Sequence, residues 1–236
     1  MRIDKYLAQM GQGTRSEVKQ LLKKGKVQVN GVVEKSPKTH VNVDQDQIEC
    51  QGKLIRYVDK IYIMLNKPKG FVSATKDDIN DTVIDLISEY NYLDIFPVGR
   101  LDKDTEGLLL ITNDGQFTHD LMSPKKHISK TYEVTAQKNI TSHDIDRFKS
   151  GIELTDGVTK PAVLKKCETS NKSLVTLFEG RYHQIKRMFH AIDNEVIELK
   201  RIAIGGLSLD EGLAPGEYRQ LTLEEIELLT NKEKEV

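Results

Sequence analysis

A single carboxylate beside an apolar run is the strongest chemical feature of the sequence. Residues 97–107 are crowded with charge and lead directly into the four apolar residues 108–111, after which Asn113-Asp114-Gly115 signals a turn. A short apolar run that stops at a turn predicts a strand buried on both faces. Asp102 would then lie just before the start of a rigid buried strand, which would hold a catalytic carboxylate firmly. The simpler alternative is an acid that caps a turn, because short motifs often occur by chance.

A second segment, residues 178–190 with its flank, has an apolar face and a cationic face at helical spacing. The apolar face comprises Ile185, Met188, Phe189 and Ile192, and the polar face comprises His183, Lys186, Arg187 and His190. The two histidines are seven residues apart, with no carboxylate between them in helical register. The pattern therefore disfavours a metal site.

The composition fits a protein with one or two apolar cores and excludes a membrane protein. The chain has 236 residues and no tryptophan, and it is 38% hydrophobic and 30% charged. No run approaches the roughly 18 apolar residues that span a bilayer, and the first residues carry no apolar signal core. Cys50 and Cys167 form no Cys-x-x-Cys pair and indicate free thiols. We therefore expect a cytoplasmic protein without a zinc site.

Charge is distributed unevenly, although the net charge is only −1. Residues 1–58 hold 11 Lys and Arg against 6 Asp and Glu, whereas the remainder holds 24 against 30. A basic head on an acidic body suggests that the head binds a polyanion, with ordinary charge scatter as the alternative.

The head begins with two predicted helices. Residues 3–10 place four apolar side chains on one helical face, which Gly11 ends. Thr14 and Glu17 match a capping box, and the helix that they begin ends at Gly25.

Cations follow one side of this second helix. Arg15, Lys19 and Lys23 are spaced four residues apart and form a strip beside the apolar face, and Lys24 and Lys26 extend the charge. The alternative is a set of lysines that only keeps the surface soluble.

Turn and linker signals complete the head. Asn30-Gly31 predicts a two-residue hairpin turn. Residues 51–60 contain no apolar run and predict a linker, so we place the domain boundary between residues 58 and 59.

The body, residues 59–236, contains signals for both strands and helices. The expected strands are 61–65, 108–111, 129–135, 163–164 and 174–177, and the expected helices are 82–90, 116–122, 141–150, the segment after Arg181, and Glu224 onward, frayed at 231–236. Between them, residues 66–70 predict a loop that exposes Lys67 and Lys69. A basic run of Lys125, Lys126, His127 and Lys130 either contacts a polyanion or forms a solvated loop.

Several motifs together resemble one enzyme family. Gly99-Arg-Leu-Asp102, Thr105-Glu-Gly-Leu-Leu-Leu110 and Glu179-Gly-Arg-Tyr-His-Gln-Ile-Lys-Arg-Met-Phe189 are similar to motifs of pseudouridine synthases of the small-subunit type. Leu213-Ala-Pro-Gly-Glu-Tyr-Arg219 resembles a closing motif of that family. Residues 1–58 resemble the small RNA-binding domain named after ribosomal protein S4. Such a domain would follow RNA phosphates and groove shape.

The resemblance implies roles for the site residues. Asp102 would be the catalytic carboxylate, acting as the nucleophile at the anomeric carbon or at uracil C6, or as the base at the ribose 2′ position. Lys186 would pair with Asp102 and keep it ionised. Tyr132 would lie under the extruded uracil, with half-buried strand packing as the alternative. Either Ile204 or Leu207 would cover the other face of the base.

The resemblance also implies contacts to RNA and the general class of reaction. Arg100 would contact phosphates beside the flipped nucleotide or fill the vacated space. The further expected RNA contacts are Arg15, Lys19, Lys23, Lys24, Lys26, Lys67, Arg181, His183 and Arg187. The substrate would be one uridine of small-subunit (16S) ribosomal RNA, free or in an assembly intermediate. The isomerisation needs no cofactor and no metal, and we expect a monomer with no membrane contact.

The implied fold is α+β. A small α-rich head with two to three helices and a hairpin would precede a catalytic domain with a mixed, mainly antiparallel sheet flanked by helices. The strand pattern permits this architecture, which comes from the resemblance.

Two rival functions remain. A non-catalytic RNA-binding protein would release no tritium from RNA that carries 5-tritiated uridine. A nucleotide-sugar transferase would use Asp102 and Asp104 as a metal-binding Asp-x-Asp pair and would lose activity with a chelator.

Overall fold

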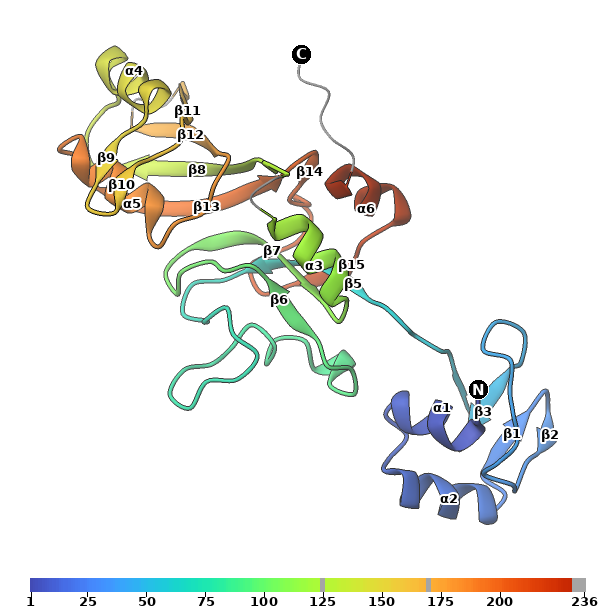
Figure 1. Ribbon diagram of the computed structural model, residues 1–236. Coiled ribbons are helices and arrows are strands. Elements are labelled where there is room, and N and C mark those ends of the chain that lie inside the picture. Colours follow the sequence, from blue (N-terminus) through green and yellow to red (C-terminus); the bar gives the residue numbers. More distant parts are fainter. Residues whose placement is uncertain (124–125, 169–170, 231–236) are drawn as a thin grey trace. The chain divides into compact units, whose positions relative to one another are not determined.

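The computed structural model describes residues 1–123, 126–168 and 171–230 (Figure 1). The chain forms two compact units. Met1–Ile61 and Ser88–Ile95 make the first unit, and Tyr62–Ile87 with the chain from Phe96 onward makes the second. The expected fraying of residues 231–236 and the expected contact of Lys125 lie outside the described residues.

The first unit contains the two predicted helices and two antiparallel hairpins. Its elements are α1 (Ile3–Gln9), α2 (Arg15–Lys23), β1 (Val27–Val29), β2 (Val32–Val33), β3 (Ile48–Cys50), β4 (Lys53–Ile55) and the 3₁₀ turn η1 (Ser88–Tyr90). The strands form one sheet in the order β2-β1-β3-β4. The capping box is confirmed, because Thr14 and Glu17 exchange their side-chain hydrogen bonds at the start of α2. The turn at Asn30-Gly31 is confirmed as well.

Two features of the first unit were not predicted. Part of the expected linker is the β3–β4 hairpin, whose turn places Gln51 and Gly52 at positive φ. Residues 88–95 also return to this unit, where Leu93 packs against its core. A methyl group on Gly11 would lie 2.5 Å from Cβ of Tyr92, so glycine at this position allows the returning segment to approach.

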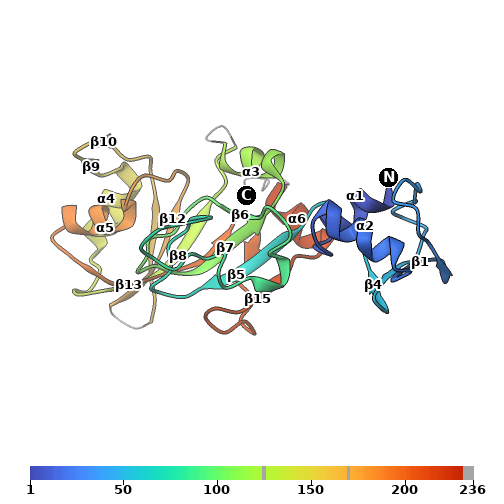
Figure 2. The same cartoon turned by 90° about the horizontal axis from the view of Figure 1, so that it is seen from below.

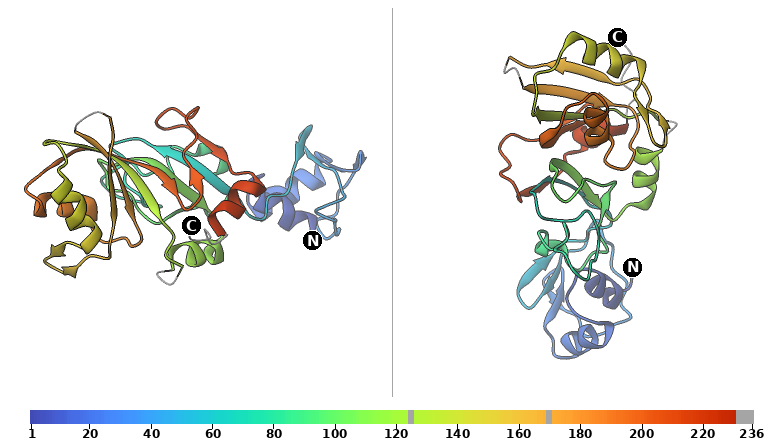
Figure 3. Two further views of the ribbon diagram at one scale, coloured as in Figure 1. Left: turned by 90° about the horizontal axis from the view of Figure 1, so that it is seen from above. Right: turned by 90° about the vertical axis from the view of Figure 1, so that its left-hand side faces the viewer.

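The second unit contains one nine-stranded sheet, whose halves carry different helices (Figures 2 and 3). Its strands are β5 (Tyr62–Lys67), β6 (Phe96–Val98), β7 (Glu106–Thr112), β8 (Lys130–Ala136), β11 (Val163–Lys166), β12 (Lys172–Leu177), β13 (Val196–Ile204), β14 (Leu207–Ser208) and β15 (Tyr218–Gln220), with the separate hairpin β9 (Glu153–Leu154) and β10 (Gly157–Val158). Its helices are α3 (Gly115–Met122), α4 (Ser142–Ser150), α5 (Gln184–Ala191) and α6 (Leu223–Thr230).

The predicted mixed, mainly antiparallel sheet is confirmed. The main order is β11-β12-β8-β13-β7-β5-β15, and only the β13–β7 pair is parallel among the described pairs of this sheet. Helices α4 and α5 pack on one face of the β11–β13 half, where Phe148 and Phe189 meet edge to face. Helices α3 and α6 share a second core with β5, β6 and β7.

The two halves of the sheet meet at a glycine. Gly107 lies opposite Arg201 in the parallel pair and has a φ of 103°. A Cβ on Gly107 would lie 2.2 Å from the carbonyl oxygen of Arg201, so no other residue fits this crossing without displacing the backbone. The apolar residues 108–111 continue from it, and all four are buried as predicted.

The helix predicted over residues 82–90 is wrong. Val83 and Ile87 are buried, but the segment is a series of turns that ends in η1. Asp85 accepts hydrogen bonds from the backbone and hydroxyl groups of Thr82, which fixes a local turn. Because residues 88–95 pack in the first unit, the chain leaves the second unit before a helix can extend.

Candidate active site

The loop that carries Asp102 lies between β6 and β7 and is fixed by a buried cation. Nζ of Lys67 donates hydrogen bonds to the carbonyl oxygens of Pro68 at 3.0 Å, Asp102 at 3.0 Å and Thr105 at 2.9 Å. The Lys67 side chain is fully buried, with a relative exposure of 0%. The predicted RNA contact of Lys67 is therefore wrong, because this lysine holds the loop from inside.

Burial also changes the titration of this lysine. The pKa of Lys67 falls from 10.5 to about 8, chiefly because the ammonium group is removed from water. The carboxylates of Asp104, Asp102 and Glu106 act in the opposite direction and limit the decrease.

A second anchor holds the same loop through Ser73. The Ser73 hydroxyl donates to the carbonyl of Leu101 at 2.8 Å and accepts from the Leu101 amide at 3.0 Å. The backbone on both sides of Asp102 is thus fixed before any substrate binds, as a preorganised site requires.

Asp102 faces a cavity of about 760 Å³ within the second unit. The polar and aromatic residues that line it include Arg100, Asp102, Asp104, Lys130, Tyr132, Arg181, Tyr182, His183, Lys186 and Arg201. The structure thus brings Asp102, Tyr132 and Lys186 to one cavity, although they come from a loop, β8 and α5.

Two nitrogen groups flank the Asp102 carboxylate. Nζ of Lys186 lies 3.4 Å from one oxygen, and Nε2 of His183 lies 3.5 Å from the other. The Asp102 side chain is 27% exposed, so it reaches the cavity and remains accessible. His183, which was expected to contact RNA, lies against this carboxylate.

Lys186 is shared by two acids. Its ammonium group donates to both oxygens of Asp104, at 2.6 and 2.7 Å, and is therefore closer to Asp104 than to Asp102. These hydrogen bonds lower the pKa of Asp104. Asp104 is 69% exposed, so solvent screens much of this interaction.

Helix α5 positions Lys186 through its buried face. Ile185, Met188 and Phe189 are buried in the core, which leaves Lys186 on the side of the cavity. His183 precedes the helix with a φ of 47°, a left-handed conformation that turns its ring toward Asp102.

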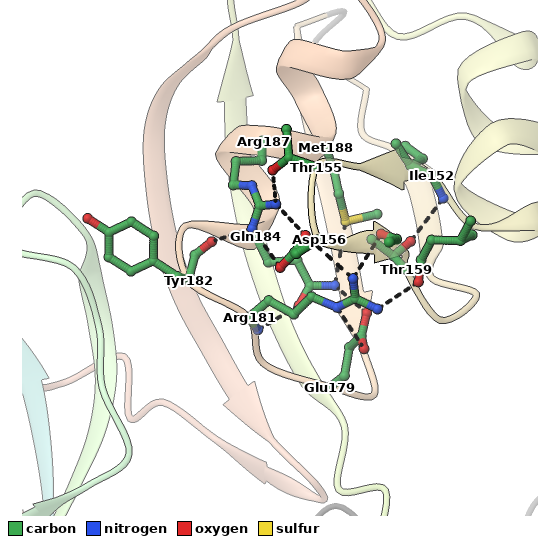
Figure 4. Close-up of polar contacts among 12 residues, drawn as sticks. Ile152, Thr155, Asp156, Thr159, Glu179, Arg181, Tyr182, Gln184, Arg187 and Met188 are labelled. Atoms are coloured by element: carbon green, nitrogen blue, oxygen red, sulfur yellow. Dashed lines mark hydrogen bonds and ion pairs between the residues drawn. The ribbon is translucent and has the colours of Figure 1, made fainter.

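Arg181 and Arg187 contact the protein itself (Figure 4). Arg181 donates to the carbonyls of Gly157 at 2.9 Å and Val158 at 2.6 Å. Arg187 pairs with Asp156 and donates to Thr155. Both guanidinium groups join the β9–β10 hairpin to the turn before α5. Both arginines thus have protein partners, with which an RNA phosphate would have to compete.

Other predicted cations remain on the surface. Arg100 is exposed and lines the cavity. On the first unit, the five cations that were expected to contact RNA are all exposed: Arg15, Lys19, Lys23, Lys24 and Lys26. In the basic run, Lys130 lines the cavity, whereas Lys126 pairs with Asp120 at 3.6 Å and His127 contacts Lys160 at 3.1 Å.

Arg201 is a cavity residue that the sequence analysis missed. It is 2% exposed, and its Nε donates to the carbonyl of Leu108 at 2.7 Å. Its cation also contributes to the lowered pKa of Lys130, for which burial is the main cause. No local pattern identifies Arg201, because its position depends on the pairing of β13 with β7.

The apolar cover expected from Ile204 or Leu207 is also wrong. Both side chains are buried in the core under α3 and α6. The apolar lining of the cavity comes from Val72, Leu101, Leu177, Ile185 and Leu199 among others.

Comparisons with known proteins agree with this geometry. A family model described as RNA pseudouridylate synthase matches residues 61–191, and an S4 domain matches residues 1–48. The chain belongs to the RNA pseudouridine synthase family. It is therefore an isomerase that acts on RNA, with an S4 domain at its N-terminal end.

Relatives match this synthase over nearly its whole length. An uncharacterized RNA pseudouridine synthase of Bacillus subtilis is 48% identical, covering 97% of this chain and 98% of the relative. The ribosomal small subunit pseudouridine synthase A of Escherichia coli K12 is 40% identical, covering 96% and 98%. A crystal structure of a pseudouridylate synthase aligns with a TM-score of 0.69 at 38% identity, covering 97% of this chain and 99% of the other.

The part of the synthase that the structure describes contains no group of three or more His, Cys, Asp or Glu side chains arranged to hold a metal ion. Asp102 and Asp104 instead flank Lys186. Among the described helices, none is long and apolar enough to cross a membrane.

Proposed function

We propose that this synthase isomerises one uridine of small-subunit (16S) ribosomal RNA, with Asp102 as the essential carboxylate. The observation that carries the proposal is the position of Asp102. Its carboxylate lies between Lys186 and His183, in the cavity that Tyr132 also lines. Relatives named ribosomal small subunit pseudouridine synthase A, at 40% and 45% identity over 96% of this chain, support the choice of RNA.

The chemistry requires an ionised carboxylate at the junction of sugar and base. The bond from ribose C1′ to N1 of uracil breaks, the uracil rotates, and C1′ bonds to C5. The hydrogen on C5 leaves as a proton and N1 gains one, so that product and substrate are isomers. Asp102 serves as the nucleophile at C1′ or C6, or as the base at the 2′ position, and each role needs the charged form. Lys186 and His183 each face one oxygen and hold the carboxylate in place.

Tyr132 supplies the flat surface that an extruded base needs. It lies on β8 and lines the cavity that Asp102 faces. Stacking on an aromatic ring replaces the neighbours that the uracil loses when it leaves the RNA helix. Arg100, exposed at the cavity, contacts the phosphates beside the flipped nucleotide.

The first unit binds the RNA outside the cavity. The exposed cations of α2 follow phosphates, and Lys24 and Lys26 continue the contact past the helix. The synthase works as a monomer in the cytoplasm on ribosomal RNA, either free or within an assembling particle.

Tritium release from RNA that carries 5-tritiated uridine tests this proposal. We expect release from a small-subunit ribosomal RNA transcript or assembly intermediate, and none from large-subunit RNA. Asp102→Asn should abolish release, whereas Asp146→Asn, a matched change on the exposed face of α4, should not. Release from large-subunit RNA alone would contradict the target, and an active Asp102→Asn variant would contradict the catalytic assignment. Mapping of pseudouridine in cells that lack the protein would identify the position.

A further inference from the structure

We propose that Tyr182 is a stacking platform for the base next to the target uridine, and therefore positions the substrate strand. This inference rests on the proposed function of the Asp102 cavity and adds a contact outside the flipped nucleotide. The Tyr182 side chain is 76% exposed and lines the cavity. A large aromatic side chain that projects into solvent beside a nucleic-acid site is a natural surface for a base.

One face of the Tyr182 ring already stacks on a protein side chain. It lies parallel to the ring of His183, with centroids 3.8 Å apart and an interplanar angle of 20°. His183 in turn contacts Asp102 through Nε2 at 3.5 Å. One face of Tyr182 is therefore covered by the residue that touches the carboxylate, and the exposed remainder of the ring is open to a neighbouring base.

The backbone of Tyr182 is fixed by its neighbours. Nη1 of Arg187 donates to the carbonyl of Tyr182 at 3.2 Å, and Arg187 is itself paired with Asp156. The side chain of Gln184 accepts from the amide of Arg181 at 2.9 Å and donates to Glu179 at 2.8 Å. Figure 4 shows the Tyr182 ring directed away from this network. The platform is thus preorganised, which lowers the entropy lost on binding.

RNA chemistry explains why a base should occupy this surface. When a uridine leaves its helix, each adjacent base loses one stacking partner. A uracil at Asp102 places an adjacent nucleotide near the residues that surround this carboxylate, and Tyr182 is one residue from His183. Stacking of a base on an aromatic side chain is sequence-tolerant, so Tyr182 would position the strand without selecting the base.

The absence of tryptophan from the sequence allows a direct measurement. In Tyr182→Trp, the only tryptophan would report stacking through its fluorescence. We expect strong quenching when the variant binds a short RNA hairpin that contains the mapped uridine. Removing one of the two flanking bases, as an abasic nucleotide, should abolish the quenching. Leu223→Trp is the matched control, because Leu223 is 81% exposed at the start of α6 and does not line the cavity.

Turnover gives a second and independent readout. Under single-turnover conditions below saturation, Tyr182→Ala should lower the rate about 10-fold, and Tyr182→Phe should retain it. RNA with the abasic nucleotide beside the target should lower the single-turnover rate of the wild type by a similar factor. In Tyr182→Ala, the same RNA should cause no further decrease in rate. A merely structural role would instead give additive losses.

The outcomes separate this inference from the proposed function. Equal quenching in the two tryptophan variants, or quenching that ignores both abasic flanks, would overturn the stacking role while leaving turnover by Asp102 intact. An active Asp102→Asn variant would overturn the proposed function, and quenching of Tyr182→Trp would still report where the RNA binds.

Discussion

The cations on α2 and the cations around α5 differ in the groups that they contact. Lys19 and Lys23 on α2 are exposed to solvent. Arg181, Lys186 and Arg187 instead donate to carboxylates and carbonyls of their own unit. An RNA phosphate can approach the first group directly, but must displace protein partners to reach the second. We therefore propose that the α2 cations bind RNA, whereas Arg181 and Arg187 hold the β9–β10 hairpin against the segment before and within α5.

Lys67, at the end of β5, is buried more completely than the cations around α5 and gives the largest expected effect on stability. Between pH 8 and 10.5 the unfolded chain binds a proton at Lys67 that the folded protein has lost, so this residue makes stability increase as pH rises. We expect the free energy of unfolding of the wild type to gain on the order of 3 kcal/mol relative to Lys67→Met over this range. Urea unfolding at several pH values measures the difference. A constant difference across the range would contradict the lowered pKa.

Turnover should also depend on Lys67. Lys67→Met removes the donor to the carbonyls beside Asp102, and the loosened loop should lower the single-turnover rate about 100-fold. Lys69→Met is the matched control. The Lys69 side chain is 45% exposed, and its Nζ lies 3.7 Å from an oxygen of Glu106. Because such an exposed ion pair contributes little, we expect little change in the single-turnover rate. Equal losses of rate in the two variants would contradict a special role for the buried lysine in holding the Asp102 loop.

A smaller effect is expected for Arg187. Arg187→Gln breaks the link from Asp156 to the carbonyl of Tyr182 and should lower the single-turnover rate about 10-fold. The slope of log Kd against log salt concentration should not change, because this guanidinium bonds to protein groups and we expect it to bind no phosphate. Lys149→Gln, which removes an exposed cation of α4, serves as the control. A lower salt slope for Arg187→Gln would make this arginine an RNA contact after all.

The smallest effects should come from α2. Lys19→Gln and Lys23→Gln should each weaken RNA binding a few-fold and lower the salt slope by about 1, with no change in single-turnover rate at saturation. Lys38→Gln, an exposed change elsewhere in the first unit, should preserve the slope. Point changes are preferable to removal of residues 1–58, since Leu93 packs against the core of this unit. Unchanged slopes in both α2 variants would refute the binding strip.

Local signals predicted those elements whose defining residues are close together in the sequence. The capping box of Thr14 and Glu17 involves residues three apart, so the sequence contains both partners. The buried run 108–111 was likewise visible as an apolar block. For the site, the family resemblance identified Asp102 and Lys186, and the structure places them 3.4 Å apart.

The missed features depend on contacts between distant segments. Lys67 appeared exposed because nothing nearby shows that the carbonyls of residues 102–105 surround its ammonium group. Arg181 and Arg187 appeared available because their partners lie on the β9–β10 hairpin, more than twenty residues earlier. The register of β13 against β7, which places Arg201 beside Gly107, has no local signal either.

The most direct test of the account compares Asp102→Asn with Asp104→Asn, since both carboxylates share Lys186. Single-turnover tritium release at saturating RNA should fall at least roughly 1,000-fold for Asp102→Asn, with RNA affinity within a few-fold of the wild type. Asp104→Asn weakens only the positioning of Lys186 and should lose about 10-fold. Release that survives in Asp102→Asn and disappears in Asp104→Asn would contradict the account.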